Sequence, residues 1–248
     1  MDLQLRDKTV FIAGASSGIG EAAARIFSQE GAHVVIAFDK NAAGAEKTAQ
    51  LVRENGRQAW LLPMDVSDPA NVGQAVRRLP PEAARLDSLV FCAGLSLHTK
   101  FADISPDEWN RIMAINLNGA FFLLQAVTPL LQDGASVVLV SSVSAQTGVS
   151  HQAHYAAAKA GLVNLAKSAA LALAPRIRVN CITPGITMTG IGQSTIDALD
   201  PDYAQNKMLL RRYATPQEIA QVIVFMASPL NSFMTGATVD VHGGRDLR

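Results

Sequence analysis

Tyr155 and Lys159 are the residues of this chain whose types and spacing most directly indicate proton-transfer chemistry. Four positions separate them within a segment of helical character, so both side chains project from one face of the helix. A free tyrosine has a pKa of about 10 and is a weak base at neutral pH, whereas a nearby ammonium group favours the phenolate and lowers that pKa. The pair could therefore act as an acid/base unit. A Tyr-x-x-x-Lys match is also common by chance and more often lies on a protein surface, so other residues must support it.

A second candidate is the serine pair Ser141-Ser142, which follows the apolar run at residues 137–140. Such a run is typical of a buried strand, and ligands of open α/β folds bind beyond the carboxyl ends of the strands. A serine hydroxyl at this edge could polarise a carbonyl group. The alternative is that both hydroxyl groups only solvate the end of the strand.

A glycine-rich segment, Gly14-Ala-Ser-Ser-Gly-Ile-Gly20, follows an expected strand and opens an alanine-rich helix. Glycines let a backbone turn sharply and approach a pyrophosphate closely, and the start of a helix offers free N–H groups and a partial positive charge. The dinucleotide contacts predicted in this segment are Gly14, Ser16, Ser17, Gly18, Ile19 and Gly20. Because the spacing is GxxxGxG rather than GxGxxG, the segment alone could also be an ordinary glycine-rich turn.

Asp39 ends the second expected strand, nineteen positions after Gly20. A carboxylate at this place accepts hydrogen bonds from the adenosine ribose hydroxyls and repels a 2′-phosphate. Lys40 follows directly and could partly offset that repulsion. The sequence therefore favours NAD(H) without excluding NADP(H), while an ordinary turn or helix-capping role for Asp39 stays open.

The hydrophobic pattern predicts elements that bring these residues to one edge of a sheet. Strands are expected at residues 9–13, 33–38, 58–62, 86–92, 137–141, 178–182 and 238–241. Helices are expected at residues 18–30, 42–55, from 67 or 68 onward, 107–131, 154–174 and 216–227. This alternation predicts an α/β protein with a doubly wound (Rossmann) seven-stranded parallel sheet and helices on both faces, as a single domain over residues 1–248. Residues 187–213 interrupt the pattern and are expected to form a substrate lid.

Composition argues against several other classes of protein. Twenty-one basic residues balance twenty-one acidic ones among 248, so no overall charge favours nucleic acid or an anionic membrane surface. The most nearly continuous apolar stretch, at residues 156–174, contains Lys159, Asn164 and Lys167, so a membrane span is not expected. The two cysteines lie in apolar runs without a second ligand at metal spacing, so they are expected to be buried free thiols and no metal site is expected. This cysteine usage and the charged residues 1–8 indicate the cytosol.

In their order along the chain, these motifs resemble those of the short-chain dehydrogenase/reductase family, and the resemblance extends over essentially the whole sequence. The matching positions are the loop from Gly14 to Gly20, Asp65-Val66, Cys92-Ala93-Gly94, Asn116, Ser142, Tyr155-x-x-x-Lys159, Pro184-Gly185 and Gly243-Gly244. The resemblance implies an oxidoreductase that transfers a hydride between a nicotinamide cofactor and a secondary alcohol or ketone.

The resemblance also implies roles for individual residues. Tyr155 would exchange the proton of the substrate oxygen, and Ser142 would hold the same oxygen. Lys159 would bind the nicotinamide ribose and lower the pKa of Tyr155, and Asn116 would hold a water that links Lys159 to bulk solvent. Further cofactor contacts would be Asp39, Lys40, Asp65, Val66, Cys92, Ala93, Gly94, Tyr155, Lys159, Pro184, Gly185, Thr187 and Thr189, the two threonines as donors to the carboxamide.

Two positions depart from the family pattern, which usually has threonine at the place of Ala13 and asparagine at that of Cys92. Both changes weaken local hydrogen bonding, and we expect altered rigidity of the cofactor loop rather than lost activity. The residues expected to line the substrate pocket are Ser96, His98, Gln146, His151, Ile191 and Leu209. His151 and His154 flank the start of the helix of Tyr155 and are interpreted as hydrogen-bonded structural residues.

Three functions fit these observations. The leading one is an NAD(H)-dependent dehydrogenase of a secondary alcohol, polyol or hydroxysteroid-like compound, which Asp39 favours. The second is an NADPH-dependent 3-oxoacyl-thioester (acyl carrier protein) reductase, for which basic residues at 207, 211 and 212 would suit a carrier-linked substrate, although a solvated helix face explains them equally well. The third is a catalytically silent nucleotide-sensing protein, against which the intact Asn116, Ser142, Tyr155 and Lys159 argue. Surplus apolar residues in the helices at 107–131 and 154–174 indicate a homo-oligomer, which by resemblance would be a tetramer.

Overall fold

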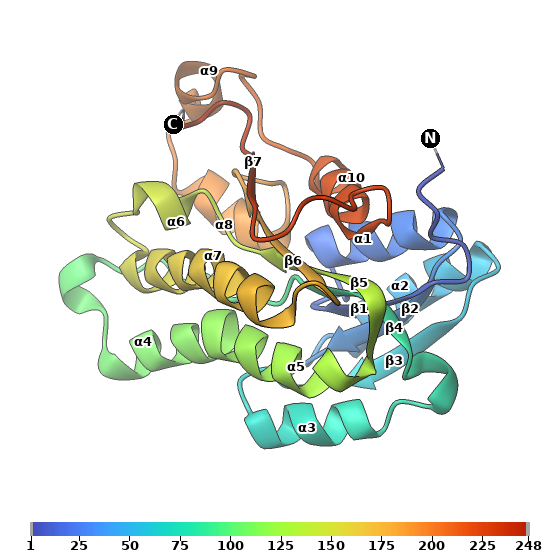
Figure 1. The fold of residues 1–248 in the computed structure, drawn as a ribbon. Coiled ribbons are helices and arrows are strands. Elements are labelled where there is room, and N and C mark those ends of the chain that lie inside the picture. Colours follow the sequence, from blue (N-terminus) through green and yellow to red (C-terminus); the bar gives the residue numbers. More distant parts are fainter. Residues whose placement is uncertain (1, 247–248) are drawn as a thin grey trace.

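The computed structural model describes residues 2–246, in which seven parallel strands form one sheet in the order β3-β2-β1-β4-β5-β6-β7 (Figure 1). The strands are β1 (Thr9–Ala13), β2 (His33–Phe38), β3 (Ala59–Pro63), β4 (Leu86–Phe91), β5 (Leu131–Val140), β6 (Arg178–Pro184) and β7 (Thr238–Val241). The strand order reverses between β1 and β4, so the chain winds outward in both directions from this point. The predicted doubly wound α/β fold is confirmed.

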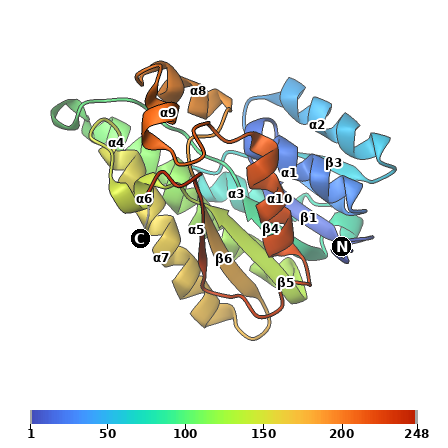
Figure 2. The ribbon, with the colours of Figure 1, turned by 90° about the horizontal axis from the view of Figure 1, so that it is seen from above.

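Helices cover both faces of the sheet (Figure 1 and Figure 2). One face carries α1 (Gly18–Gln29), α2 (Ala42–Glu54) and α10 (Pro216–Ala227), and the other carries α3 (Pro69–Arg77), α4 (Pro106–Met113), α5 (Gly119–Val127) and α7 (Ala153–Leu173). Three short helices, α6 (Ser144–Thr147), α8 (Gly190–Asp197) and α9 (Tyr203–Lys207), lie at one end of the sheet (Figure 1). Single 3-10 turns occupy Pro81–Ala83, Phe101–Asp103 and Thr128–Leu130.

The central strand β1 and the carboxyl-terminal halves of β4 and β5 are apolar because both of their faces are buried. In β1, Phe11 and Ala13 pack into the cluster under α3, α5 and α7, whereas Val10 and Ile12 pack under α1 and α10. Side chains alternate between the two faces with a period of two residues. Polar chemistry is therefore left to the loops that leave the ends of the strands.

The long helix predicted at residues 107–131 is confirmed as a continuous helical stretch, Pro106–Leu130, but it contains a π-helical turn that the sequence pattern did not predict. Helix α4 ends at Met113, Ala114–Asn118 form a π-helical turn, α5 ends at Val127, and Leu131 already begins β5. The N–H of Gly119 bonds to the carbonyl of Ala114, five residues back, which is the pattern of a π-bulge. A Cβ at Gly119 would lie 2.7 Å from the carbonyl oxygen of Val66, so only glycine allows the chain to pass this loop so closely.

Other element ends differ from the predictions by one or two residues, which is the ordinary uncertainty of helix and strand boundaries, except in β5. This strand starts six residues before the predicted start at 137 because Pro129 ends the preceding helical turn and releases the chain into extended conformation. The stretch Pro106–Leu130, taken through its turns, is long and apolar enough to cross a membrane by length and composition alone. In the described residues it packs against α3 and α7 as one layer of the fold.

Candidate active site

A pocket of about 790 Å³ opens at the carboxyl ends of the strands, beside the point where the strand order reverses. Loops that follow β1, β2, β3, β4, β5 and β6 form its wall together with α7 and α8. The predicted cofactor residues all lie on this wall: Gly14, Ser16, Ser17, Gly18, Ile19, Gly20, Asp39, Lys40, Asp65, Val66, Cys92, Ala93, Gly94, Tyr155, Lys159, Pro184, Gly185, Thr187 and Thr189. Residues that are far apart in the sequence thus meet where the sheet topology brings them together.

The glycine loop fits the close approach of a dinucleotide phosphate. Gly14 has a φ of +81°, and a Cβ there would lie 2.7 Å from the backbone nitrogen of Ala93. A Cβ at Gly20 would collide with the carbonyl oxygen of Gly14. Ser17 stands at the N-cap of α1 without a side-chain hydrogen bond to the helix, so the first N–H groups of α1 keep their capacity to bind an anion.

At the end of β2, Asp39 and Lys40 are both exposed and both line the pocket. The next residue, Asn41, caps α2 by accepting a hydrogen bond from the N–H of Gly44 and donates to the carbonyl of Ser16 at 3.2 Å. This bond joins the loop after β2 to the glycine loop. Because Asn41 does the capping, Asp39 is not the helix cap that the sequence left open.

After β3, the Asp65 carboxylate accepts hydrogen bonds from the N–H and the hydroxyl of Ser67, at 2.9 and 2.6 Å. The N–H of Asp65 donates to the side chain of Asn71. These bonds fix the Asp65-Val66 turn at the pocket wall.

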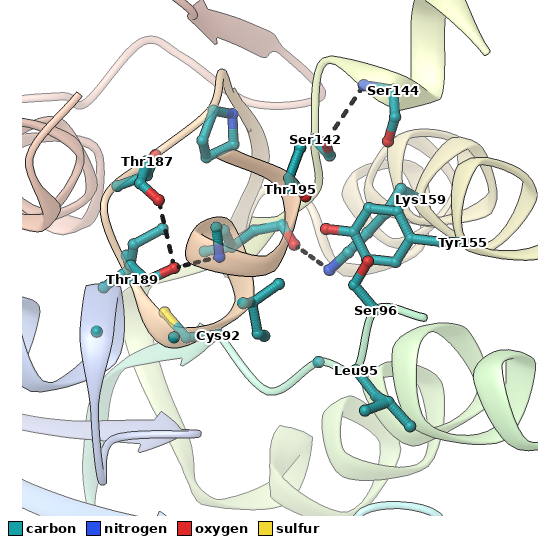
Figure 3. A pocket seen from close by; sticks show the side chains of 18 of the residues that line it. Cys92, Leu95, Ser96, Ser142, Ser144, Tyr155, Lys159, Thr187, Thr189 and Thr195 are labelled. Carbon is teal, nitrogen blue, oxygen red and sulfur yellow. Dashed lines mark hydrogen bonds between the residues drawn. The ribbon is translucent and has the colours of Figure 1, made fainter. Parts of the chain in front are cut away.

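The two serines after β5 have different environments. The buried Ser141 hydroxyl donates to the carbonyl of Lys159 at 2.7 Å and so joins β5 to α7. The Ser142 oxygen accepts the N–H of Ser144 at 3.2 Å and lies on the pocket wall (Figure 3). The geometry therefore leaves Ser142, rather than Ser141, able to donate its hydroxyl proton to a ligand.

Lys159 is 4% exposed, and its ammonium group donates to the carbonyl of Val140 at 2.9 Å. The Nζ atom lies 5.5 Å from the centre of the Tyr155 ring (Figure 3). Burial lowers the pKa of Lys159 to about 8, which the neighbouring Cys181 and Cys92 partly oppose. The pair predicted from the sequence does come together at the pocket.

The expected lowering of the Tyr155 pKa by Lys159 is wrong for this structure. Burial raises the pKa of Tyr155 to about 12, and a hydrogen bond with Ser142 only partly opposes this effect. The physical reason is that the phenolate would lose its hydration, while the ammonium group of Lys159 is turned toward the backbone of β5. In the structure Tyr155 therefore holds its proton strongly.

Asn116 lies behind the pocket wall rather than on it and is fully buried. Its amide nitrogen donates to the carbonyls of Leu95 and Ile112 at 2.9 and 3.0 Å, and its Oδ1 accepts the N–H of Leu95 at 3.3 Å. These bonds fix the loop after β4 to the π-helical turn. A Cβ at Gly94 would lie 3.0 Å from Asn116 Oδ1 and 3.6 Å from Lys159 Nζ, so this glycine keeps the space between the two side chains open.

The loop after β6 is held by its own threonines. Thr187 donates to the carbonyl of Gly185 at 3.1 Å, and Thr189 caps α8 by accepting the N–H of Gly192 at 3.0 Å. Both threonines line the pocket (Figure 3).

Cys181 is buried and free, as predicted, whereas Cys92 is free but only half-buried as a residue at the pocket wall, although its thiol group itself is buried. Burial raises the pKa of each thiol to about 12, so neither is a thiolate at neutral pH. The N–H of Cys92 donates to the carbonyl of Ala13 at 2.9 Å, so the two residues that depart from the family pattern keep their backbone connection.

The predicted substrate wall is right in four places and wrong in two. Ser96, His98, His151 and Ile191 line the pocket. Gln146 does not, because its amide donates to the carboxylate of Asp240 at 2.7 Å, at the edge strand β7. Leu209 also lies off the pocket wall and is largely exposed.

Gln152 is one of several wall residues that the sequence analysis missed, others being Leu95, Arg111, Thr195, Tyr203 and Arg245. It is 5% exposed, and its Nε2 lies 2.7 Å from Ser96 Oγ and 3.0 Å from His98 Nε2. Gln152 stands directly before α7 with a non-helical backbone, so the helical spacing that links Tyr155 to Lys159 does not extend to it.

His154 is fully buried and joins α7 to α4, as expected of a structural histidine. Its Nδ1 accepts the N–H of Tyr155 at 2.9 Å, so its Nε2 carries the proton and donates to Glu108 at 2.8 Å. Hydrogen bonds from Thr99 and His154 hold the pKa of Glu108 below its usual value. The first turn of the helix that carries Tyr155 is thus fixed by a side chain of α4.

Comparisons with known proteins agree with this geometry. A family model described as "Enoyl-(Acyl carrier protein) reductase" matches residues 14–246. The chain is 35% identical to "L-rhamnose 1-dehydrogenase (NAD(P)(+))" of Sphingomonas sp. (strain SKA58) over 97% of this chain and 96% of that protein. It is also 35% identical to a 3-oxoacyl-(acyl-carrier-protein) reductase of Thermotoga maritima, over 98% and 99% of the two chains.

A solved structure, "Short-chain dehydrogenase/reductase SDR:Glucose/ribitol dehydrogenase" from Brucella melitensis, superposes with a TM-score of 0.94 at 32% identity and covers 100% of both chains. The match extends over the sheet, the pocket and the lid segment together. With the pocket geometry and the family model, it shows that the chain belongs to the short-chain dehydrogenase/reductase family.

Proposed function

We propose that the protein oxidises a secondary alcohol to a ketone, and catalyses the reverse reduction, with NAD(H) as the preferred cofactor and Tyr155 as the acid/base. The observation that carries this proposal is that the side chains of Ser142, Tyr155 and Lys159 lie on the same pocket wall as the glycine loop. When bound, a nicotinamide dinucleotide accepts or supplies the hydride. The residues that would hold it are the cofactor residues of the pocket wall, because Gly14 and Gly20 leave no room for a side chain where its phosphates need the backbone.

The side chains supply the proton chemistry. Ser142 accepts a backbone N–H and hydrogen-bonds with Tyr155, so its hydroxyl proton can be donated to a substrate oxygen bound beside Tyr155. Tyr155, with its pKa raised to about 12, carries a proton at neutral pH and can give it to the oxygen of a ketone during reduction. Lys159, whose ammonium lies 5.5 Å from the centre of the Tyr155 ring, would bind the nicotinamide ribose. In the oxidative direction, the phenolate takes the proton of the alcohol.

The variant Tyr155→Phe tests this assignment, because it removes the proton and keeps the ring. We expect NADH binding within about twofold of the wild-type value and a loss of turnover of at least about a thousandfold. Turnover that survives in the variant would contradict the role of Tyr155. A wild-type protein that binds NADH tightly and turns over no alcohol or ketone would instead support the nucleotide-sensing function.

The preference for NAD(H) rests on Asp39 at the end of β2. Its carboxylate lies on the pocket wall, where it would repel a 2′-phosphate, and Lys40 beside it is exposed. Fluorescence titration with NADH and NADPH measures the preference directly. We expect tighter binding of NADH by the wild type and a reversed or abolished preference in Asp39→Ser. Tighter binding of NADPH by the wild type would overturn the preference and favour the 3-oxoacyl reductase.

Three further features belong to this proposal. Residues 187–213, with α8 and α9, would act as the substrate lid. The exposed apolar side chains of Trp109 on α4, Phe121 on α5 and Leu171 on α7 support a homo-oligomer, with a tetramer as the expected state. The free thiols of Cys92 and Cys181 support a cytosolic location. Light scattering at several protein concentrations tests the assembly, and cell fractionation tests the location.

A further inference from the structure

We infer that Ser96, His98 and Gln152 form a subsite for a second hydroxyl group of the substrate, so that the preferred substrates are vicinal diols and polyols rather than simple alcohols or acyl thioesters. This inference rests on the proposed function, because it concerns the same pocket. It goes further in naming the residues that select the substrate and the chemical group that they select.

Gln152 is the centre of this subsite. It lies in the segment before α7 and is 5% exposed, although a glutamine is ordinarily a surface residue. Its Nε2 donates to Ser96 Oγ at 2.7 Å and to His98 Nε2 at 3.0 Å, and both of these residues lie in the loop after β4. A buried amide that joins two wall segments of a pocket holds both of them in a fixed position.

The bonds of Gln152 leave other groups of the cluster available to a ligand. Ser96 Oγ acts as an acceptor toward Gln152, so its hydroxyl proton can be donated. His98 accepts at Nε2, so its Nδ1 carries the ring proton. Gln152 Oε1 makes no hydrogen bond within the described residues, and all three side chains line the pocket. The subsite thus offers donors and an acceptor together, which is what a hydroxyl group requires because it both donates and accepts.

The charge of the subsite also fits a neutral polar ligand. Burial and the neighbouring His151 lower the pKa of His98, so the imidazole is uncharged at neutral pH. An uncharged cluster has no strong attraction for a carboxylate or phosphate. An apolar acyl chain would displace water from these polar groups and offer them no hydrogen bond in return. Leaving buried polar groups without partners weakens binding.

The subsite lies beside Tyr155, so the hydroxyl group that it binds belongs to the carbon adjacent to the one that is oxidised. Gln152 is the residue directly before α7 and precedes Tyr155 by three residues. Ser96 and Tyr155 are drawn on the same side of the pocket in Figure 3. On α8 of the lid segment, Thr195 Oγ1 lies 3.4 Å from His98 Nε2, so the lid contacts the same cluster. A ligand that binds here therefore contacts the loop after β4, the start of α7 and the lid together.

Matched alcohols test the inference. The probes are 2-butanol and 2,3-butanediol, with cyclohexanol and cis-1,2-cyclohexanediol as a second pair, and the measured quantity is the ratio of kcat/KM for the diol to that for the simple alcohol. We expect a ratio of about ten or more for the wild-type protein. Gln152→Met keeps the length of the side chain and removes its hydrogen bonds, and Ser96→Ala removes the hydroxyl. Each variant should bring the ratio close to one by lowering kcat/KM for the diol.

Gln146→Met is the matched control, because Gln146 is also a glutamine near the pocket but bonds to Asp240 outside it. It should leave the ratio unchanged. If the wild type oxidises diols and simple alcohols equally well, or if Gln152→Met lowers kcat/KM for both probes by the same factor, the subsite is overturned while the proposed function stands. If the wild type oxidises no probe with NAD+ or NADP+, the proposed function is overturned, and the subsite with it.

Discussion

The two ends of the pocket recognise their ligands by different means. At the cofactor end, backbone atoms are packed so tightly that Gly14 and Gly20 have no space for a Cβ. At the predicted substrate end, side chains form the wall, and Ile191 of the predicted lid segment is 43% exposed. The cofactor end is therefore built from backbone geometry, and the substrate end from exchangeable side chains.

This difference separates what is common to a family from what distinguishes its members. A phosphate bound by backbone N–H groups needs small residues and a helix start, and few sequences satisfy that requirement. A wall of side chains such as Ser96 and Gln152 can change its specificity by single substitutions without disturbing the sheet. The boundary between the two ends lies at Thr187 and Gly192, where a Cβ on the glycine would collide with the threonine carbonyl. The start of the predicted lid segment is thus closely packed, whereas Ile191 farther along it is exposed.

Among the variants that test this contrast between the two ends, Gly20→Ala has the largest expected effect. Its Cβ would collide with the carbonyl oxygen of Gly14, which is backbone and cannot rotate away. We expect a rise of at least about tenfold in the Kd of NADH and a loss of about 1–3 kcal/mol in the free energy of unfolding. Fluorescence titration and urea denaturation measure the two quantities.

Gly190→Ala is the control for Gly20→Ala at the other end of the pocket, since a Cβ at Gly190 meets nothing within 4 Å. Its free energy of unfolding should stay within about 0.5 kcal/mol of the wild-type value. Equal losses in both variants would show that the contrast between the two ends is wrong.

The same contrast explains how far the sequence was informative. The glycine loop, the Asp65-Val66 turn and the Tyr155–Lys159 pair are all at the pocket, because a strand followed by a turn and a helix dictates where backbone and first-turn residues lie. The sequence did not show which of the two glutamines, Gln146 or Gln152, lines the substrate pocket. Only the path of the chain through α6 turns Gln146 toward β7, and sequence spacing does not determine that path.

Two other features depended on properties that a sequence does not contain. The π-helical turn at Ala114–Asn118 arises from the close passage of Gly119 over Val66, which is a tertiary contact. The raised pKa of Tyr155 arises from burial, and burial cannot be calculated from the four-residue spacing to Lys159.

The next prediction concerns pH, because the catalytic pair lies between the two ends and is buried. With the pKa of Tyr155 raised to about 12, the phenol keeps its proton from pH 7 to 9, so reduction of a ketone should change little over this range. Oxidation requires the phenolate, whose fraction rises about tenfold per pH unit below the pKa. Oxidation should therefore rise steeply with pH across this range.

Initial rates in both directions, at saturating cofactor and constant ionic strength, test this pH dependence. Oxidation that is already level at pH 7, together with reduction that falls above pH 7, would contradict it. That result would mean that the charge of Lys159 outweighs burial during catalysis.

A smaller effect is expected at His154, where a side chain rather than backbone packing fixes a buried part of the site. His154→Ala removes the bonds to Glu108 and to the N–H of Tyr155. We expect kcat to fall about tenfold and the free energy of unfolding to fall by about 1–3 kcal/mol, with the Kd of NADH unchanged.

His154→Asn is the matched variant, because its side-chain oxygen can accept the N–H of Tyr155 as Nδ1 does, without the bond to Glu108. It should recover part of the lost kcat. A fall in NADH affinity equal to the fall in kcat would show that His154 supports the whole pocket and not the position of Tyr155.

The smallest effect is expected at the exposed residue Ile191 in the predicted lid segment, residues 187–213. Ile191 lines the pocket from α8 and is 43% exposed, so Ile191→Ser removes apolar contact with a substrate while little buried surface is lost from the fold. The free energy of unfolding should change by about 0.5 kcal/mol or less, and the Kd of NADH should not change. The KM of a diol substrate should rise about two- to fivefold with kcat nearly constant, because the lost contact stabilises the bound substrate and the transition state equally. A fall in kcat without a rise in KM would show instead that α8 acts in the reaction step, and that the lid is as tightly coupled to the chemistry as the glycine loop is to the cofactor.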